Sequence, residues 1–288
     1  MEKDQNIIEE KPKKSFKTKL LNILIIIVIL IMGVYLYAKY VGTSGVFTRE
    51  YFIKSNNIPK NFSGSKIVYF SDVLIGSTTS EDTLNEIKDK VNELNPDIIL
   101  FGGGLISDTY KINDKTKLVE YLKGFNALLG KYASLGKNDS NEIKELLTES
   151  GFTYLDNNSE LIYKNGDTPI CLIGMNSYLL GEYSLENINK CANYFTVIFT
   201  HESDLLYKLT EYNYDMFLAG GTLGGEVEVP FYGPIYKFEG SMDYYKSEYD
   251  DNGKKAYISN GFGTKKSYIR LNNRPSFNFF RLKSTDQK

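Results

Sequence analysis

The feature that most constrains this chain is an apolar run near its amino terminus, LLNILIIIVILIMGVYLYA, at residues 20–38. Nineteen helical residues at about 1.5 Å each span close to the ~30 Å hydrocarbon core of a bilayer. Lysines are frequent before this run and sparse after it. By the positive-inside rule we predict a basic cytoplasmic tail at 1–19, a transmembrane signal-anchor helix at 20–38 and an extracytoplasmic remainder. This is the arrangement expected of a single-pass protein of the cell membrane.

A cleaved signal peptide is the alternative interpretation of the same run. Its apolar region would be unusually long, and no small-x-small cleavage site follows it. We therefore predict an uncleaved anchor that contacts the lipid bilayer. A linker with an edge strand is predicted at 39–60, and one folded domain at 61–288.

Composition limits the kinds of site that this domain can carry. The net charge of -2 gives no electrostatic reason to expect a nucleic-acid partner. His201 is the single histidine, whereas binuclear hydrolase sites draw several ligands from imidazole. Cys171 and Cys191 lack the CxxC spacing of metal and redox motifs, and we do not expect a disulfide between them.

Hydrophobic patterning indicates an α/β domain. A buried strand at 66–70 leads into the loop at 71–77, a helix capped by Ser80 follows, and the next strand lies at 98–101. This βαβ unit predicts parallel pairing. Further helices are predicted at 114–129, 141–150 and 203–211. The remaining segments are rich in strands and include an edge strand at 46–53. Loops that follow such strands gather at one edge of a sheet, where ligands bind.

Five of these loops together resemble the metal-binding motifs of the calcineurin-like metallophosphoesterases, in the expected order. The first motif, Ser-Asp-Leu-His-Leu-Gly in the family, is similar to Ser71-Asp72-Val73-Leu74-Ile75-Gly76. The other four correspond to Gly103-Gly104-Leu105-Ile106-Ser107, Gly136-Lys137-Asn138-Asp139, His201-Glu202 and Gly220-Gly221-Thr222-Leu223-Gly224-Gly225-Glu226. The resemblance covers roughly residues 57–284, and the segments 257–264 and 269–275 closely resemble the C-terminal strands of the membrane-anchored bacterial branch. It implies a four-layer α/β/β/α sandwich of two mixed sheets.

The family binds two divalent metals (Mn, Fe or Zn), and water between them attacks a phosphorus centre. Only two of the corresponding side chains are kept here, Asp72 and His201, as a vestigial metal pair. The substituted positions of this degenerate site are Leu74, Gly104, Lys137, Asn138, Gly221 and Leu223. Because two protein ligands cannot hold a binuclear centre, we predict that no catalytic residue set is intact and that a metal cofactor is not bound.

The surviving residues allow more than one interpretation. Asp72 is either a remnant ligand or a carboxylate that accepts backbone N–H groups of its own turn, and His201 is either a ligand or a hydrogen-bonded structural residue. Lys137 is the one new cation among the ligand positions, so we hypothesise that it reaches Asp72 and replaces the charge of the metals. Leu74 and Leu223 should then pack together over the site.

Two further features stay open. Asp108 and Glu226 lie near substituted positions and could act as substitute ligands, although a displacement by even one residue usually points a side chain in another direction. The glycine clusters at 102–104 and 220–221 could cradle an anion through backbone N–H groups, although they lack a specific phosphate-loop pattern.

These observations favour a catalytically inactive pseudoenzyme with a binding or regulatory role at the cell envelope. Its partner would be an envelope protein or a phosphorylated ligand. The first alternative is an active phosphohydrolase with a reduced metal centre that cleaves a phosphomonoester or phosphodiester, such as a lipid head group. The second is an anion or nucleotide binder without turnover.

Overall fold

The computed structural model describes residues 15–112, 114–251 and 253–285. The helices are α1 (Phe16–Leu36), α2 (Glu81–Glu93), α3 (Lys115–Lys123) and α4 (Asn141–Glu149), with a π-helical turn η1 (Tyr37–Val41) after α1. Shorter 3-10 helices are η2 (Lys60–Phe62), η3 (Asn189–Cys191), η4 (Ser203–Leu209) and η5 (Leu223–Gly225). Most of the predicted basic tail lies outside the described residues.

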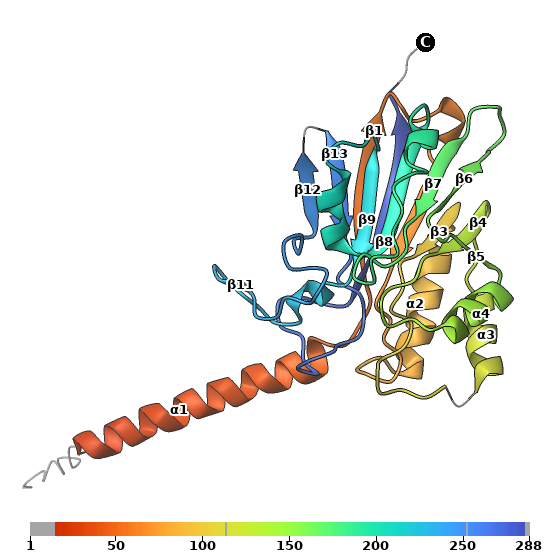
Figure 1. Ribbon diagram of the computed structural model, residues 1–288. Coiled ribbons are helices and arrows are strands. Elements are labelled where there is room, and N and C mark those ends of the chain that lie inside the picture. Colours follow the sequence, from red (N-terminus) through yellow and green to blue (C-terminus); the bar gives the residue numbers. More distant parts are fainter. Residues whose placement is uncertain (1–14, 113, 252, 286–288) are drawn as a thin grey trace, which may run out of the picture.

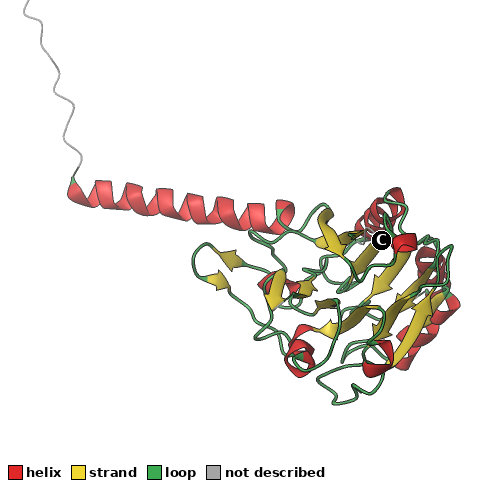
Figure 2. Ribbon diagram, turned by 90° about the horizontal axis from the view of Figure 1, so that it is seen from above, coloured by secondary structure: helices red, strands yellow, loops and turns green. Residues whose placement is uncertain are grey.

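The apolar run forms the helix that its composition predicts. In the described part of the chain, α1 together with η1 is the one helix long and apolar enough to cross a membrane. None of the α1 side chains is buried against the domain. Figure 2 shows α1 projecting from the domain as a single long helix. The helix already begins at Phe16, so the lysines at 17 and 19 form its first turn rather than a preceding tail.

The first sheet is mixed and has the order β1-β14-β2-β3-β4-β5. Its strands are β1 (Phe47–Ser55), β2 (Lys66–Phe70), β3 (Ile98–Phe101), β4 (Gly130–Ala133), β5 (Phe152–Tyr154) and β14 (Ser276–Ser284). Strands β2 to β5 are parallel, as the βαβ pattern predicts, whereas β14 is antiparallel to β2. The predicted edge strand is confirmed as β1.

The second sheet has the order β12-β13-β9-β8-β7-β6 and is also mixed. Its strands are β6 (Asn158–Ile162), β7 (Ile170–Gly174), β8 (Phe195–Glu202), β9 (Met216–Gly220), β12 (Glu248–Asp251) and β13 (Lys254–Ile258). A separate two-stranded hairpin, β10 (Glu228–Val229) and β11 (Gly233–Pro234), follows β9 and η5. Figure 1 shows the two sheets facing each other, with α2, α3 and α4 beside the first sheet.

The alternation of side chains along β2 explains the layers. Val68 and Phe70 belong to the core beneath the helices, whereas Ile67 and Tyr69 belong to the core between the sheets. A strand with both faces buried reads as a continuous apolar run, and the other central strands share this property. The predicted sandwich is therefore confirmed, with 3-10 helices rather than α-helices outside the second sheet.

Two helix predictions are corrected by tertiary packing. The helix expected over 114–129 ends at Lys123, because Gly124 caps it and Phe125 turns into the core against the ring of Phe70, with 5.3 Å between centroids. The segment 203–211 forms the 3-10 helix η4 instead of an α-helix.

The expectation of two unpaired cysteines is wrong. Cys171 of β7 and Cys191 of η3 form a disulfide across a sequence separation of 20 residues. Both residues are buried in the core behind the second sheet, among the side chains of β7, β8 and η4. Their spacing could not predict the pairing, because it depends on how η3 packs onto β7.

We predict that this disulfide stabilises the domain by about 3 kcal/mol, the chain-entropy value for a loop of this size. The double variant Cys171→Ala/Cys191→Ala should lower the free energy of unfolding in urea by that amount. Wild-type protein unfolded with a reductant serves as the control, since it keeps both side chains. Equal unfolding curves with and without reductant would contradict the prediction.

Candidate functional site

The candidate site lies where the carboxyl ends of strands from both sheets meet. Asp72 follows β2, His201 and Glu202 end β8, and Gly221 follows β9. The loops after β3 and β4 reach the same edge, and they bring residues 102–108 and 134–139 to the site. The structure therefore brings all five predicted loops together.

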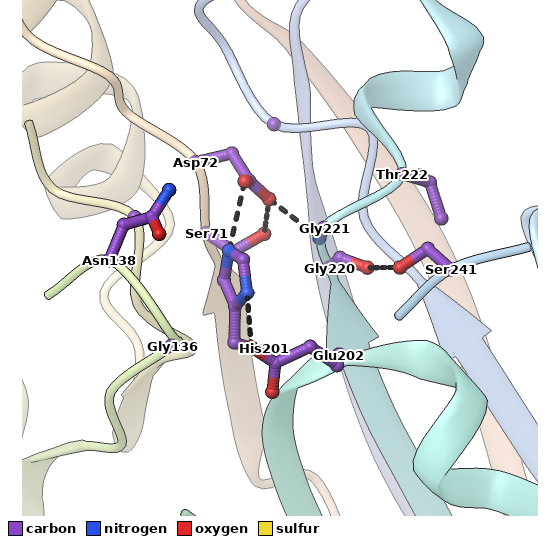
Figure 3. Close-up of polar contacts among 12 residues, drawn as sticks. Ser71, Asp72, Gly136, Asn138, His201, Glu202, Gly220, Gly221, Thr222 and Ser241 are labelled. Atoms are coloured by element: carbon purple, nitrogen blue, oxygen red, sulfur yellow. Dashed lines mark hydrogen bonds and ion pairs between the residues drawn. The ribbon is translucent and has the colours of Figure 1, made fainter. Parts of the chain in front are cut away.

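Asp72 and His201 form a direct ion pair between the two sheets (Figure 3). His201 Nε2 lies 3.0 Å from Asp72 Oδ1. The other carboxylate oxygen, Oδ2, accepts hydrogen bonds of 2.8 Å from the hydroxyl of Ser71 and the backbone N–H of Gly221. Asp72 does accept a backbone N–H, but from the facing sheet rather than from its own turn.

Glu202 completes a buried group of three charges. Its Oε1 lies 3.3 Å from His201 Nδ1 and accepts from the hydroxyl of Ser177 and the N–H of Lys137. Its Oε2 accepts from the N–H of Tyr178. With a carboxylate at each ring nitrogen, the imidazole has two acceptors, which is the arrangement that the protonated ring satisfies.

The pKa values of these groups follow from their contacts. Burial alone would lower the pKa of His201, but the charges and hydrogen bonds of Asp72 and Glu202 outweigh it and raise the pKa well above 6.5. Burial alone would raise the pKa of Asp72, and the His201 charge holds it well below its usual range. The pKa of Glu202 is lowered for the same reason, against the effect of burial.

Glycines allow the loops to close tightly around this pair. A Cβ on Gly136 would lie 2.5 Å from His201 Cγ, and one on Gly261 would lie 2.5 Å from Asp72 Cβ. A Cβ on Gly104, the position of the family's bridging Asp, would lie 3.0 Å from Asp72 Cα and would require a left-handed residue with φ of +74°. Backbone therefore occupies the space around Asp72 from several sides.

Asp139 is a site residue whose role sequence reasoning missed. Its Oδ2 accepts from the N–H groups of Gly104 (2.8 Å) and Gly136 (3.0 Å), and its Oδ1 accepts from that of Leu105 (3.3 Å). The backbone cradle expected at glycines 102–104 is thus filled by a carboxylate of the protein itself. The signal in the sequence was the Asp that ends the third loop.

The hypothesis that Lys137 pairs with Asp72 is wrong. The Lys137 Nζ lies 2.9 Å from Glu239 Oε2 at the exposed rim of the site, and His201 takes the position beside Asp72. Asn138 donates to Asp108 Oδ1 at 2.9 Å on the same rim. His201 is already buried and bonded to Asp72. It therefore excludes the long side chain of Lys137, whose ammonium group would have to lose its hydration to reach that position.

The predicted packing of Leu74 against Leu223 is confirmed. Both side chains are buried, and they form a small apolar cluster with Phe238. Nearby, the carboxylate of Glu226 accepts from the backbone N–H groups of Lys265, Lys266 and Ser267. Glu226 therefore holds the loop at 265–267 in place.

Arg270 is the other residue that sequence reasoning missed. Its guanidinium is fully buried and donates to the carbonyls of Leu223, Asn260, Gly263 and Asn273. Burial lowers the pKa of Arg270 to about 10, although Glu226 and Asp72 oppose that change. The arginine ties together the loops after β9, after β13 and before β14.

A cavity of about 380 Å³ opens over His201 and Glu202. Four lysines line it, namely Lys137, Lys237, Lys265 and Lys266, together with the carboxylates of Asp108, Asp139 and Glu239. Leu74, Ile106, Leu179 and Phe238 contribute apolar walls. The cavity has the mixed lining of a small-ligand pocket.

The residues do not match the donor set of a binuclear metal centre. Among the described residues, no three His, Cys, Asp or Glu side chains converge on a position that could hold a metal ion. Both oxygens of Asp72 accept hydrogen bonds from the protein, and both ring nitrogens of His201 already have carboxylate partners. Where the family would place an Asn and further imidazoles, the chain has Lys137, Gly221 and Leu223.

The chain is similar in sequence to known metallophosphoesterases. The chain is 30% identical over 261 residues to the uncharacterized metallophosphoesterase YkuE of Bacillus subtilis, covering 88% of this chain and 91% of that protein. It is 24% identical over 229 residues to the UDP-2,3-diacylglucosamine pyrophosphatase LpxG of Chlamydia muridarum, covering 60% of this chain and 69% of that protein. The solved structure of TT1561 of Thermus thermophilus aligns with 68% of this chain and 89% of its own, with a TM-score of 0.46 and 10% identity. No protein-family model matches the chain.

We predict that the His201 ring stays protonated well above pH 6.5, its ordinary pKa. Because His201 is the single histidine, its Cε1–Hε1 signal in NMR follows this group alone. Asp72→Asn removes one of the two carboxylate charges and should move the titration down towards 6.5. A wild-type midpoint at or below 6.5 would contradict the ion pair.

The same pair predicts how stability depends on pH. The raised pKa of His201 gives stability that is complete below pH 6.5 and is lost as pH rises through the folded-state pKa. The lowered pKa of Asp72 gives stability that is present above pH 3.8 and is lost as pH falls through its folded-state pKa. Asp72→Ala should therefore cost about 3–5 kcal/mol in urea unfolding between these values. The cost should shrink at alkaline pH, and a cost independent of pH would argue against the charge pair.

Proposed function

Since the chain belongs to the metallophosphoesterase family, we propose that it is a catalytically inactive member whose site binds a ligand without hydrolysing it. The observation that carries this proposal is the direct pairing of Asp72 with His201. The two side chains that survive from the family's metal positions satisfy each other, and in the described chain no third His, Cys, Asp or Glu side chain converges with them on a position that could hold a metal ion. Binuclear hydrolysis depends on cations that lower the pKa of water and offset phosphoryl charge.

The charges of the site support this proposal. In an active relative, metal cations balance the carboxylates at the sheet edge. Here the imidazolium of His201 lies between Asp72 and Glu202, so one internal cation takes over this balance. A protonated histidine is neither a metal ligand nor a general base. This arrangement of charges stabilises the loops of the site and does not favour hydrolysis.

The lysine-lined cavity supports a phosphate-bearing ligand. Lys265 and Lys266 border the pocket, and Glu226 fixes their backbone, so that their side chains are presented from a held loop. Point cations of this kind suit phosphate groups, and the apolar walls of Leu74 and Phe238 suit an adjoining apolar group. The name of the relative LpxG describes a pyrophosphatase acting on UDP-2,3-diacylglucosamine. A lipid-linked phosphate or pyrophosphate head group is the ligand class that fits both observations.

We further propose that the domain is extracytoplasmic and anchored in the cell membrane with a cytoplasmic amino terminus. The lysines before the apolar run support this orientation. The Cys171–Cys191 disulfide gives independent support, since disulfides persist in oxidising compartments. An envelope protein that reads the ligand-bound state is then the kind of partner that a regulatory role requires.

Because the proposed site does not hold a binuclear metal centre, we predict that the purified full-length chain contains less than stoichiometric metal. We also expect that it does not hydrolyse an aryl phosphodiester with added Mn²⁺. Elemental analysis and product release measure the two properties. A metallophosphoesterase with all its ligands serves as the positive control. Stoichiometric metal together with turnover that Asp72→Ala abolishes would instead establish an active phosphohydrolase.

Because we propose that the lysine-lined cavity binds a phosphate-bearing ligand, we predict that a phosphate-bearing lipid head group raises the thermal unfolding temperature of the chain. Lys265→Ala/Lys266→Ala should weaken binding about tenfold, since each exposed charge contact contributes up to ~1 kcal/mol. Lys283→Ala is the matched control, because Lys283 lies near the carboxyl end of β14, at the end of this strand away from the site. Inorganic phosphate and a nucleotide tested alongside separate head-group binding from general anion binding, and no shift with any of them would remove this ligand class.

A further inference from the structure

The β10–β11 hairpin exposes an apolar surface that nothing in the described part of the domain covers. Its strands belong to neither main sheet. Residues 229–235, Val-Pro-Phe-Tyr-Gly-Pro-Ile, contain no charged side chain. Phe231 is fully exposed and Tyr232 is 77% exposed, with Val229 and Ile235 also in contact with solvent. Single exposed apolar residues are ordinary, whereas four large ones on one hairpin mark an interaction surface.

The hairpin projects on the side of the domain from which α1 leaves. Figures 1 and 2 show this in two perpendicular views, with the hairpin beside the end of α1 nearest the domain. The exposed tyrosines Tyr37 and Tyr40 lie at that same end of the helix. Tyrosine is enriched at the boundary between membrane and water, so this end of the helix is at the level of the lipid head groups when α1 spans a bilayer.

A chain of backbone hydrogen bonds fixes the hairpin relative to the helix. The N–H of Arg270 donates to the carbonyl of Ala38 in η1 at 3.0 Å. The next residue, Leu271, donates to Glu226 and accepts from Glu228, at the base of the hairpin. Gly42 lies so close to the Arg270 carbonyl that a Cβ would overlap it. The guanidinium of Arg270 is itself buried, so this junction is part of the folded core.

We propose that the tip of the hairpin, Phe231 and Tyr232 with Val229 and Ile235, inserts into the membrane interface beside α1 as a second lipid contact. The partner is the phospholipid bilayer; the inference rests on the proposed anchoring of α1 in it, and the hairpin projects on the same side of the domain as α1. Two prolines and a short turn limit the conformational freedom lost on insertion. The carboxyl edge of β9, which leads into η5 and the hairpin, is thereby held close to the lipid surface. This proposal does not depend on whether the site is catalytic.

Fluorescence tests the proposal in the full-length chain, because the sequence has no tryptophan. Phe231→Trp places a single reporter at the tip, and Tyr163→Trp is the matched control. Tyr163 is 55% exposed and follows β6, at the amino end of β7 and therefore at the opposite end of the domain. Both variants are reconstituted in phosphatidylcholine nanodiscs with or without bromine on the acyl chains.

We expect brominated lipid to remove roughly half of the tryptophan emission of the Phe231→Trp variant, as for a side chain ~5–10 Å into the interface, and to leave the emission of the Tyr163→Trp control unchanged. Tyr232→Trp repeats the test at the neighbouring position, in case Phe231→Trp alters the turn. Emission from both tip variants that is as insensitive to bromine as that of the control would overturn the proposal. Bromine-insensitive emission that changes with protein concentration would assign the surface to a second copy of the chain instead.

Discussion

The buried ion pair of Asp72 and His201 is the interaction on which the organisation of the site depends. It joins the ends of β2 and β8, one strand from each sheet, and so connects the two halves of the sandwich at their carboxyl edges. Removing His201 would leave the buried carboxylate of Asp72 without a cation, and removing Asp72 would leave His201 with Glu202 as its remaining carboxylate partner. This pair contacts the N–H of Gly221 and the carboxylate of Glu202, and the surrounding glycines leave room for it.

The pair is one of several internal contacts that hold the five site loops in shape. Asp139 occupies the glycine cradle, Leu74 and Leu223 fill apolar space, and Glu226 holds the lysine loop through three N–H groups. Internal charges and packing therefore hold the loops around the pocket. Above the pair, the pocket stays open.

Arg270 extends the framework from the site to the membrane side. Its side chain bonds four carbonyls around the site, while its backbone bonds Ala38 in η1, directly after α1, and, through Leu271, the hairpin base. One residue thus couples the geometry of the pocket loops to the geometry of the anchor. The domain is consequently held by the chain in one orientation relative to α1, rather than tethered through a flexible linker.

The sequence by itself determined the long apolar amino-terminal helix, the βαβ pattern and the five loops at one sheet edge. These properties are local, since they depend on periodicity, capping and the identity of residues that follow strands. Only the tertiary structure decided which groups pair. His201 rather than Lys137 bonds Asp72, Asp139 fills the cradle, Cys171 meets Cys191 and Arg270 is buried. Each of these contacts joins residues far apart in the chain, so burial and competition among partners select it, and no spacing in the sequence records that choice.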